Sequence, residues 1–173
     1  MSWMSGISRE SQISGGTSSA TIELTENTID PAACLDEFTL RAGGAGAVVS
    51  FAGLVRPQTP SSAVSKLHLQ AYSPMTERGI ETACADALER WPLTAATVVH
   101  RIGNMQPGET IVFVATATAH RRAAFEAADF LMDYLKTEAV FWKKETLETG
   151  EEVWIEPRGE DYTDRQRWKT TKG

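Results

Sequence analysis

Alternation of apolar and polar positions predicts several β-strands along this chain. In the segment 64–72 (VSKLHLQAY) the two kinds of residue alternate, as in a strand with one buried face. Segments 95–103 and 109–118 are rich in valine and threonine and are joined by the turn NMQPG, which predicts two successive strands. Segment 45–56 has small and β-branched residues throughout, which favours a buried strand. Strands are also expected over 21–29, 139–147 and 151–156, the last two forming a hairpin around ETG.

Apolar positions three and four apart predict helices between these strands. Segment 119–137 carries such a stripe on one face. The residues of the stripe are Ala124, Ala128, Leu131 and Leu135. Segments 30–44 and 73–91 each begin with a residue suited to cap a helix, Asp30 or Ser73, followed directly by proline. Because helices and strands mix without strict alternation, the predicted fold class is α+β.

The two ends of the chain lack such patterns. Residues 1–20 are rich in serine and glycine and aperiodic, which predicts a disordered N-terminal extension. Residues 158–173 form a charged C-terminal tail that no pattern places. The segment between them, 21–157, has the length and apolar content of one domain with its own core.

Charge and cysteine content narrow the class of function. The formal net charge of −6 argues against a binder of nucleic acid or of an anionic membrane, because both need a dominant positive field. Cys34 and Cys84 lie far apart with no nearby histidine pair, so we expect no metal site, no disulfide framework and no cofactor. No apolar run is long enough for a membrane helix or a signal sequence, so we expect a cytoplasmic protein.

Basic groups within this acidic chain suggest a site for a small anion. Arg56 ends a predicted strand before a proline-rich loop, where a cation is often simply solvated. His120 and Arg121 begin a predicted helix, whose free N–H groups already attract anions, so these cations are unfavourable there unless an anion is shared. Arg122 has an ordinary explanation, since Glu126 lies one turn further on.

A third basic group surrounds two aromatic residues in the segment 132–145. Strand alternation predicts one face with Phe141, Lys143 and Glu145, and another with Val140, Trp142 and Lys144. A lysine beside apolar walls and other cations loses part of its preference for the charged form, and can then act as a nucleophile or general base. Lys136 also has an ordinary alternative, as a cation at a helix C-terminus with Asp133 as a partner.

Several of these segments together resemble one known family. GAVVSFAGLVR, YSPMTE, AHRRAAFEAADFLMDYLKT and FWKKE occur in the same order as in the catalytic (large) subunit of molybdopterin synthase, from about Gly46 to Glu156. The resemblance implies an α/β hammerhead fold with an additional small antiparallel sheet. It also implies a homodimer that binds a small ubiquitin-like sulfur-carrier subunit at each end, giving a heterotetramer.

The resemblance further implies a sulfurtransferase of molybdenum cofactor biosynthesis. Sulfur would pass from the thiocarboxylated C-terminus of the carrier to cyclic pyranopterin monophosphate (precursor Z), making the molybdopterin dithiolene. Lys136 and Lys143 match the catalytic lysines of the family. The implied substrate-binding residues are Leu54, Val55, Arg56, His120, Arg121, Lys136, Lys143, Lys144 and Glu145.

One position departs from the family pattern. Many relatives have a basic residue where this chain has Leu54, so an anion contact at that turn would come from the backbone or from Arg56. Arg158 is a further candidate that could reach the pocket of a neighbouring subunit. Two other functions stay open from the residues alone. One is a phosphate-binding transferase in which Lys136 forms a Schiff base, and the other is a scaffold that docks the carrier without turnover.

Overall fold

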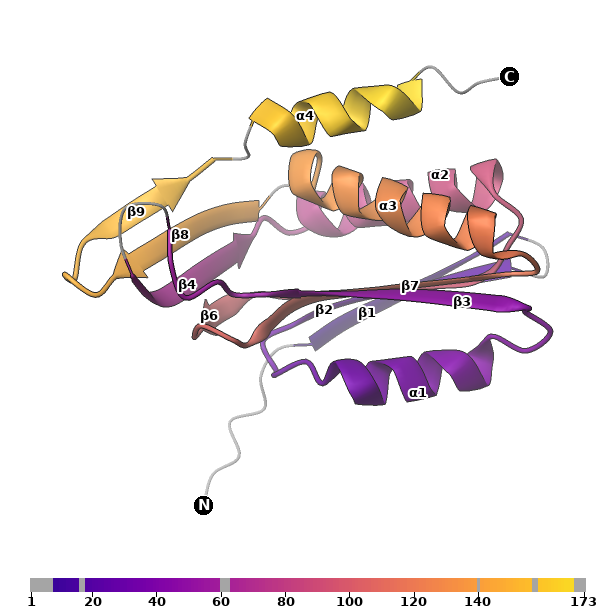
Figure 1. The fold of residues 1–173 in the computed structure, drawn as a ribbon, viewed down its shortest axis with the longest axis horizontal. Helices are drawn as coiled ribbons and strands as arrows, with labels where there is room; N and C mark the ends of the chain where they lie inside the picture. The colour runs from indigo at the N-terminus through magenta and orange to yellow at the C-terminus, as the bar shows by residue number, and fades with distance from the viewer. Residues whose placement is uncertain (1–7, 16–17, 60–62, 140, 157–158, 170–173) are drawn as a thin grey trace.

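Two β-sheets and the helices that cover them form the fold, as Figure 1 shows for the computed structural model. The structure describes residues 8–15, 18–59, 63–139, 141–156 and 159–169. The larger sheet has the strand order β1-β2-β5-β7-β3, in which only β2 and β5 pair in parallel. Its strands are β1 (Ser8–Gly15), β2 (Ser18–Thr25), β3 (Ala47–Leu54), β5 (Leu93–Arg101) and β7 (Thr110–Thr118).

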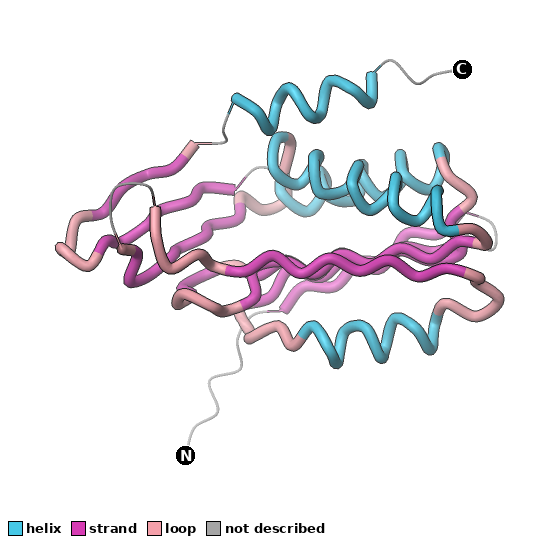
Figure 2. The backbone as a smooth tube through the Cα atoms, in the orientation of Figure 1, coloured by secondary structure: helices cyan, strands magenta, loops and turns pink. Residues whose placement is uncertain are grey.

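Helices cover both faces of the larger sheet (Figures 1 and 2). Helix α1 (Pro31–Arg41) lies on one face, and α2 (Met75–Arg90) and α3 (Arg121–Thr137) lie on the other. The predicted cap of α1 is confirmed, since Asp30 Oδ1 accepts a hydrogen bond from the N–H of Ala32 at 2.9 Å. The predicted cap of α2 is wrong, because the N-cap is Pro74 and no side chain bonds there.

The core fills the space between the sheet and its helices. Beneath α2 and α3, strand residues such as Val98 and Val114 pack with the predicted apolar stripe of α3, including Leu131. Beneath α1, Phe38 and Phe113 belong to a second cluster. None of the described helices is both long and apolar enough to cross a bilayer.

Both cysteines are free thiols, and both are at least partly shielded from solvent. Cys84 of α2 is fully buried in the core, and this burial raises the pKa of its thiol to about 12. Cys34 of α1 is half-buried, and burial together with the nearby carboxylate of Glu23 also raises the pKa of its thiol.

A second, smaller sheet continues from one end of the larger one (Figure 1). Its antiparallel strands, in the order β6-β4-β8-β9, are β6 (Gly103–Met105), β4 (Val64–Ala71), β8 (Phe141–Leu147) and β9 (Glu152–Ile155). A small cluster of Val55, Leu67, Leu69 and Met105, with Phe141 packed against it, lies where the sheets meet. The predicted α+β fold with an additional small antiparallel sheet is confirmed.

The expected disorder of residues 1–20 is not observed over 8–15 and 18–20. Strand β1 pairs along its whole length with β2, which itself begins at Ser18. An ion pair of 2.8 Å between Arg9 and Glu77 also joins β1 to α2. Backbone pairing holds most of this polar strand, and of its described side chains Ile13 alone packs against the core, which is why its composition resembles that of a linker. Residues 1–7 lie outside the described residues.

Strand β3 lies at the edge of the larger sheet, so the prediction of a buried position for segment 45–56 is wrong. Its side chains Val48, Phe51 and Leu54 are 38%, 43% and 53% exposed. The small and β-branched composition suits a central strand, but β5 and β7 occupy the centre. An apolar strand at a sheet edge presents unpaired backbone groups that favour pairing with another chain.

The charged C-terminal segment is folded rather than an unplaced tail. Helix α4 (Gly159–Gln166) and the 3-10 turn η1 (Arg167–Lys169) run along the outer side of α3 (Figure 1). Trp168 anchors this segment, since its ring packs edge-on against Trp91 and Phe130 with centroids 5.6 and 5.7 Å apart. The predicted face for Val140 and the predicted reach of Arg158 lie outside the described residues.

Candidate functional site

The first group of candidate residues lies where β7 runs into α3. His120 is the N-cap of α3 with extended backbone and makes no side-chain cap bond, so the first-turn N–H groups of the helix remain without a side-chain acceptor. The hydroxyl of Thr118 donates to the carbonyl of His120 at 2.7 Å and fixes this junction. The arrangement combines a helix N-terminus with His120 and Arg121, the two residues that the sequence places there.

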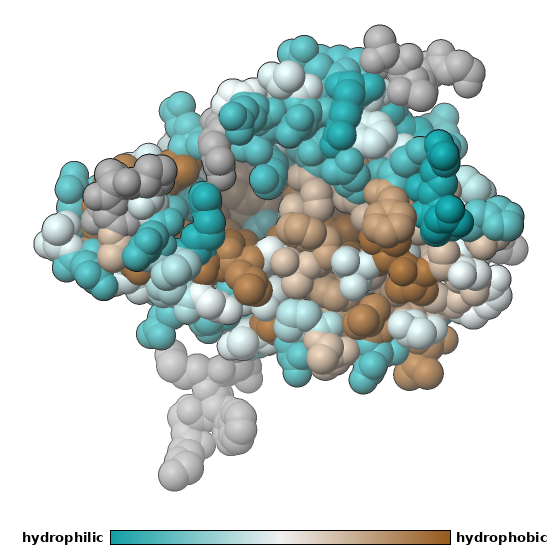
Figure 3. All heavy atoms as spheres, viewed as in Figure 1, coloured by the Kyte–Doolittle hydropathy of each residue, from teal (hydrophilic) through white to brown (hydrophobic). Residues whose placement is uncertain are grey.

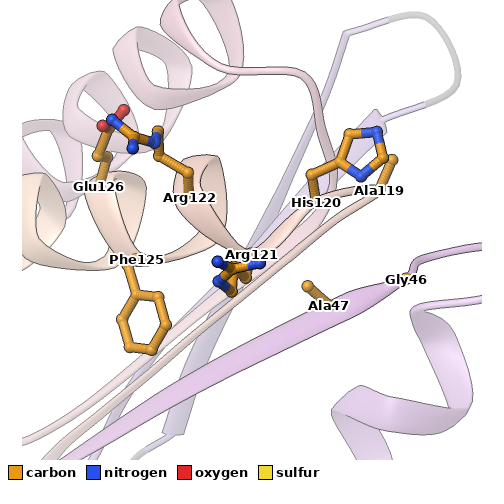
Figure 4. A pocket seen from close by; sticks show the side chains of 8 residues that line it. All are labelled: Gly46, Ala47, Ala119, His120, Arg121, Arg122, Phe125 and Glu126. Atoms are coloured by element: carbon orange, nitrogen blue, oxygen red, sulfur yellow. The ribbon is translucent and has the colours of Figure 1, made fainter.

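A surface hollow of about 700 Å³ opens at this junction. Its lining residues, shown in Figure 4, are Gly46, Ala47, Ala119, His120, Arg121, Arg122, Phe125 and Glu126. Arg121 and Phe125 point toward β3, whereas Arg122 points away from it, toward Glu126. A Cβ at Gly46 would lie 2.4 Å from the carbonyl oxygen of Ala119, so the close approach of the two chains here requires glycine.

The second group lies at the other end of α3. Lys136 is in the last helical turn, and its Nζ lies 3.3 Å from Oδ1 of Asp161 in α4. The expected pairing with Asp133 is wrong, because Oδ2 of Asp133 is bound by Arg167 at 2.8 Å and by the indole N–H of Trp168 at 2.7 Å. Sequence reasoning missed Asp161, although acidic residues followed by basic ones over 160–167 are typical of a short helix.

The predicted faces of strand β8 are confirmed. Lys143 Nζ lies 3.2 Å from Oε1 of Glu145, two residues along the same face, and Glu145 is buried. Lys144 points to the opposite face, where it pairs with Glu152 at 2.9 Å and lies over the ring of Trp154. Glu145 therefore orients Lys143, whereas Lys144 belongs to the outer face of the small sheet.

The turn after β3 belongs to this second end. Leu54 is exposed, and Val55 is buried in the cluster between the sheets. The N–H of Val55 donates to the carbonyl of Glu109 at 2.9 Å, and the carbonyl of Val55 accepts from Gly108 at 2.9 Å. The backbone of Val55 is thus occupied, which leaves the exposed side chain of Arg56 as the group suited to meet an anion at this turn.

Within one chain, the two groups of basic residues lie far apart. Helix α3 has 17 residues, so its ends lie about 25 Å apart at 1.5 Å per residue. Along the neighbouring edge, Ala47 of β3 pairs with Thr118 and Leu54 pairs with Thr110, so Arg56 lies at the far end from His120. Within one chain, Arg56 therefore does not join His120 and Arg121 in a single anion site, and Lys136 and Lys143 lie at the same end as Arg56.

A buried histidine supports the strand that carries Lys143. The ring of His100 stacks on Phe141 of β8 with centroids 4.1 Å apart, and its Nδ1 lies 3.0 Å from the carbonyl oxygen of Arg101. Burial lowers the pKa of His100 to about 4, although the bond to the Arg101 carbonyl opposes this shift. The imidazole is therefore neutral near pH 7, and Nδ1 is the protonated nitrogen, since it must donate to the carbonyl.

Acid should destabilise the protein through this histidine. Because the folded-state pKa of about 4 lies below the ordinary 6.5, the unfolded chain binds the extra proton, and stability is lost as pH falls between these values. The loss by pH 4 is roughly 3 kcal/mol in the free energy of unfolding, at about 1.36 kcal/mol per pKa unit. Denaturant titrations at pH 7 and pH 4 of wild type and His100→Asn measure this loss. An equal acid dependence in both proteins would contradict the assignment.

The described residues contain no cluster of three or more histidine, cysteine or acidic side chains placed to hold a metal ion. The candidate site residues are mainly basic. Two arginines and a histidine lie at one end of α3, and two lysines and an arginine lie at the other. Such groups bind phosphate or carboxylate and transfer protons.

Known proteins match this chain over most of its length. The sequence model described as "MoaE protein" matches residues 24–138. A molybdopterin synthase catalytic subunit of Mesorhizobium japonicum is 47% identical over 152 residues, covering 87% of this chain and 94% of that one.

Solved structures give the same result. A molybdopterin biosynthesis MoaE protein from Burkholderia ambifaria has a TM-score of 0.71 and 39% identity, covering 86% of this chain and 96% of that one. Molybdopterin synthase from Staphylococcus aureus has a TM-score of 0.69 and 32% identity, covering 76% of this chain and 94% of that one. The resemblance seen in the sequence motifs is confirmed, and the chain belongs to the MoaE protein family.

Proposed function

We propose that this chain is the catalytic subunit of a molybdopterin synthase. It transfers sulfur from the thiocarboxylated C-terminus of a small ubiquitin-like carrier subunit to cyclic pyranopterin monophosphate (precursor Z), making the molybdopterin dithiolene. The observation that carries the proposal is the pair of cationic ends of α3, in a chain of the MoaE family. One end suits the cyclic phosphate of the substrate, and the other suits proton transfer.

Lys136 and Lys143 are the proposed catalytic residues. Attack of the thiocarboxylate sulfur on the pyranopterin builds negative charge on the substrate and requires proton transfer. Two ammonium groups can stabilise that charge and supply the protons. Glu145, 3.2 Å from Lys143, holds one of them in place. Lys144 faces away and borders the site without taking part.

The proposed substrate site needs a second copy of the chain. His120 and Arg121 lie at the Ala47 end of β3, whereas Arg56 and the lysines lie at its Leu54 end. If β3 pairs antiparallel with β3 of a second copy, the Ala47 end of one strand lies beside the Leu54 end of the other. His120 and Arg121 of one copy then approach Arg56 and the lysines of its neighbour. We infer a homodimer in which each site draws on both chains.

The surface along β3 supports this dimer. Hydrophobic surface gathers across the front of the molecule where β3 lies in Figure 1, as Figure 3 shows. The exposed apolar side chains of this region are Val48, Phe51 and Leu54 of β3 and Phe125 of α3, the last 61% exposed. Exposed apolar residues beside the open edge of a sheet are typical of a subunit interface. Carrier subunits at both ends of the dimer would complete the proposed heterotetramer, and the cytoplasmic location stays a prediction.

Reconstitution tests the proposed reaction. The purified chain, thiocarboxylated carrier and cyclic pyranopterin monophosphate are mixed, and the products are followed by mass spectrometry. We expect the substrate to gain two sulfur atoms and the carrier to return with a C-terminal carboxylate. Carrier that binds without turnover would support a scaffold instead. A borohydride-trapped adduct between Lys136 and the substrate would support the Schiff-base transferase.

A further inference from the structure

The C-terminal segment brings a carboxylate to the proposed catalytic Lys136. Asp161 lies in the first turn of α4, and its Oδ1 is 3.3 Å from Nζ of Lys136. The Asp161 side chain is only 17% exposed, whereas that of Lys136 is 52% exposed. The Asp161 side chain is thus largely packed into the fold, while about half of the lysine side chain remains exposed at the surface.

The position of α4 does not depend on this ion pair. One turn before Lys136, on the same side of α3, Oδ2 of Asp133 binds Nη2 of Arg167 and the indole N–H of Trp168. The Trp168 ring is packed against Trp91 and Phe130. Because these contacts fix the far end of the segment, loss of the Asp161–Lys136 pair leaves α4 in place.

The other charged groups around Lys136 already have partners. Glu138 at the C-terminus of α3 pairs with Arg165 of α4, whose guanidinium lies over the ring of Tyr134. Asp133 is bound by Arg167, as described above. Of the carboxylates that α3, α4 and the η1 turn place near this helix end, Asp161 is the one that contacts the Lys136 ammonium.

We propose that Asp161 is a positioning residue for Lys136, which orients the lysine ammonium and keeps it ready to donate a proton. The proposal rests on the proposed role of Lys136 in sulfur transfer. The C-terminal segment is then part of the active site.

Asp161→Asn tests the proposal in the full chain with thiocarboxylated carrier and substrate. We expect kcat to fall about five- to tenfold, less than the roughly 10²–10⁴-fold expected when a general acid or base is itself removed, because Lys136 is still present. We expect the loss in kcat and not in KM or in carrier binding, because the substitution changes the position of the lysine ammonium without removing a group that binds substrate or carrier. Asp161→Glu should restore most of the rate. Asp164→Asn makes the same charge change at an exposed position of α4 and should leave kcat unchanged.

The outcomes separate this inference from the function it rests on. A wild-type kcat in Asp161→Asn, together with an inactive Lys136→Ala, would overturn the role of Asp161 and leave the proposed function intact. A faster Asp161→Asn enzyme would also overturn it, since Asp161 would then restrain the lysine. Full activity of Lys136→Ala would remove the basis of both.

Discussion

Replacing Lys136 with alanine is expected to lower the rate of sulfur transfer by about 10²–10⁴-fold while leaving the fold and carrier binding intact, since this is the usual contribution of a general acid or base. The side chain is half exposed, and its one described ion pair, with Asp161, is a surface contact, so little stability depends on it. Single-turnover sulfur transfer measures the rate, and light scattering with the carrier measures assembly.

Lys144→Ala is the matched control for this experiment. It removes the same charge from the same stretch of chain, but the Lys144 side chain contacts Glu152 and Trp154 on the outer face of the small sheet. We expect a loss of less than about threefold, as for a charge that touches neither substrate nor base. A Lys144→Ala enzyme more impaired than Lys136→Ala or Lys143→Ala would show that the wrong face of β8 has been assigned to the site.

Mixed dimers should recover activity that neither parent shows. A chain with Lys136→Ala and a chain with Arg121→Ala, co-expressed with different tags and purified through both, form a dimer with one doubly damaged site and one intact site. If each site draws on both chains, this dimer should have about half the wild-type activity per dimer, as the two-fold symmetry requires. Each parent homodimer carries the same defect in both sites and should be nearly inactive.

The control is a mixed dimer of one chain with Lys136→Ala and one chain with Lys143→Ala. Both lysines lie at the same end of the chain, so each of the two sites then contains one defect and no activity returns. Recovery in this control, or no recovery in the first combination, would contradict a site shared between two chains. If the Lys136→Ala and Arg121→Ala chains show no recovery together, each chain would have to complete its own site.

Local patterns in the sequence predict most of the elements but not their places in the sheets. The alternation in 64–72 and the apolar stripe of 119–137 locate β4 and α3 closely, because both patterns record which face is buried. Segment 45–56 has the composition of a central strand, yet β3 is an edge strand, since strand order depends on pairing between distant segments. If the proposed dimer forms, the same composition has a reason, because a second copy then covers this edge.

The site residues are individually recognisable from the sequence, but their grouping is not. His120 and Arg121 lie at the start of α3 and Lys136 lies near its end. The sequence motif that contains all three therefore spans a helix about 25 Å long. A linear motif does not say which of its residues meet in one chain. Asp161 escapes sequence reasoning for another reason. Its helix has no apolar stripe and is held by Trp168 and by ion pairs to α3.

The burial of the two cysteine thiols limits the routes by which sulfur can be transferred in the proposed reaction. Sulfurtransferases that carry sulfur as a cysteine persulfide need an accessible thiolate at neutral pH. Burial keeps Cys84 protonated, with a pKa of about 12, and Cys34 is half-buried beside the carboxylate of Glu23. In the proposed reaction no persulfide therefore forms on this chain, and sulfur passes directly from one bound partner to the other. Alkylating agents and mild oxidants inactivate sulfurtransferases that use a cysteine persulfide, but they should leave this chain active.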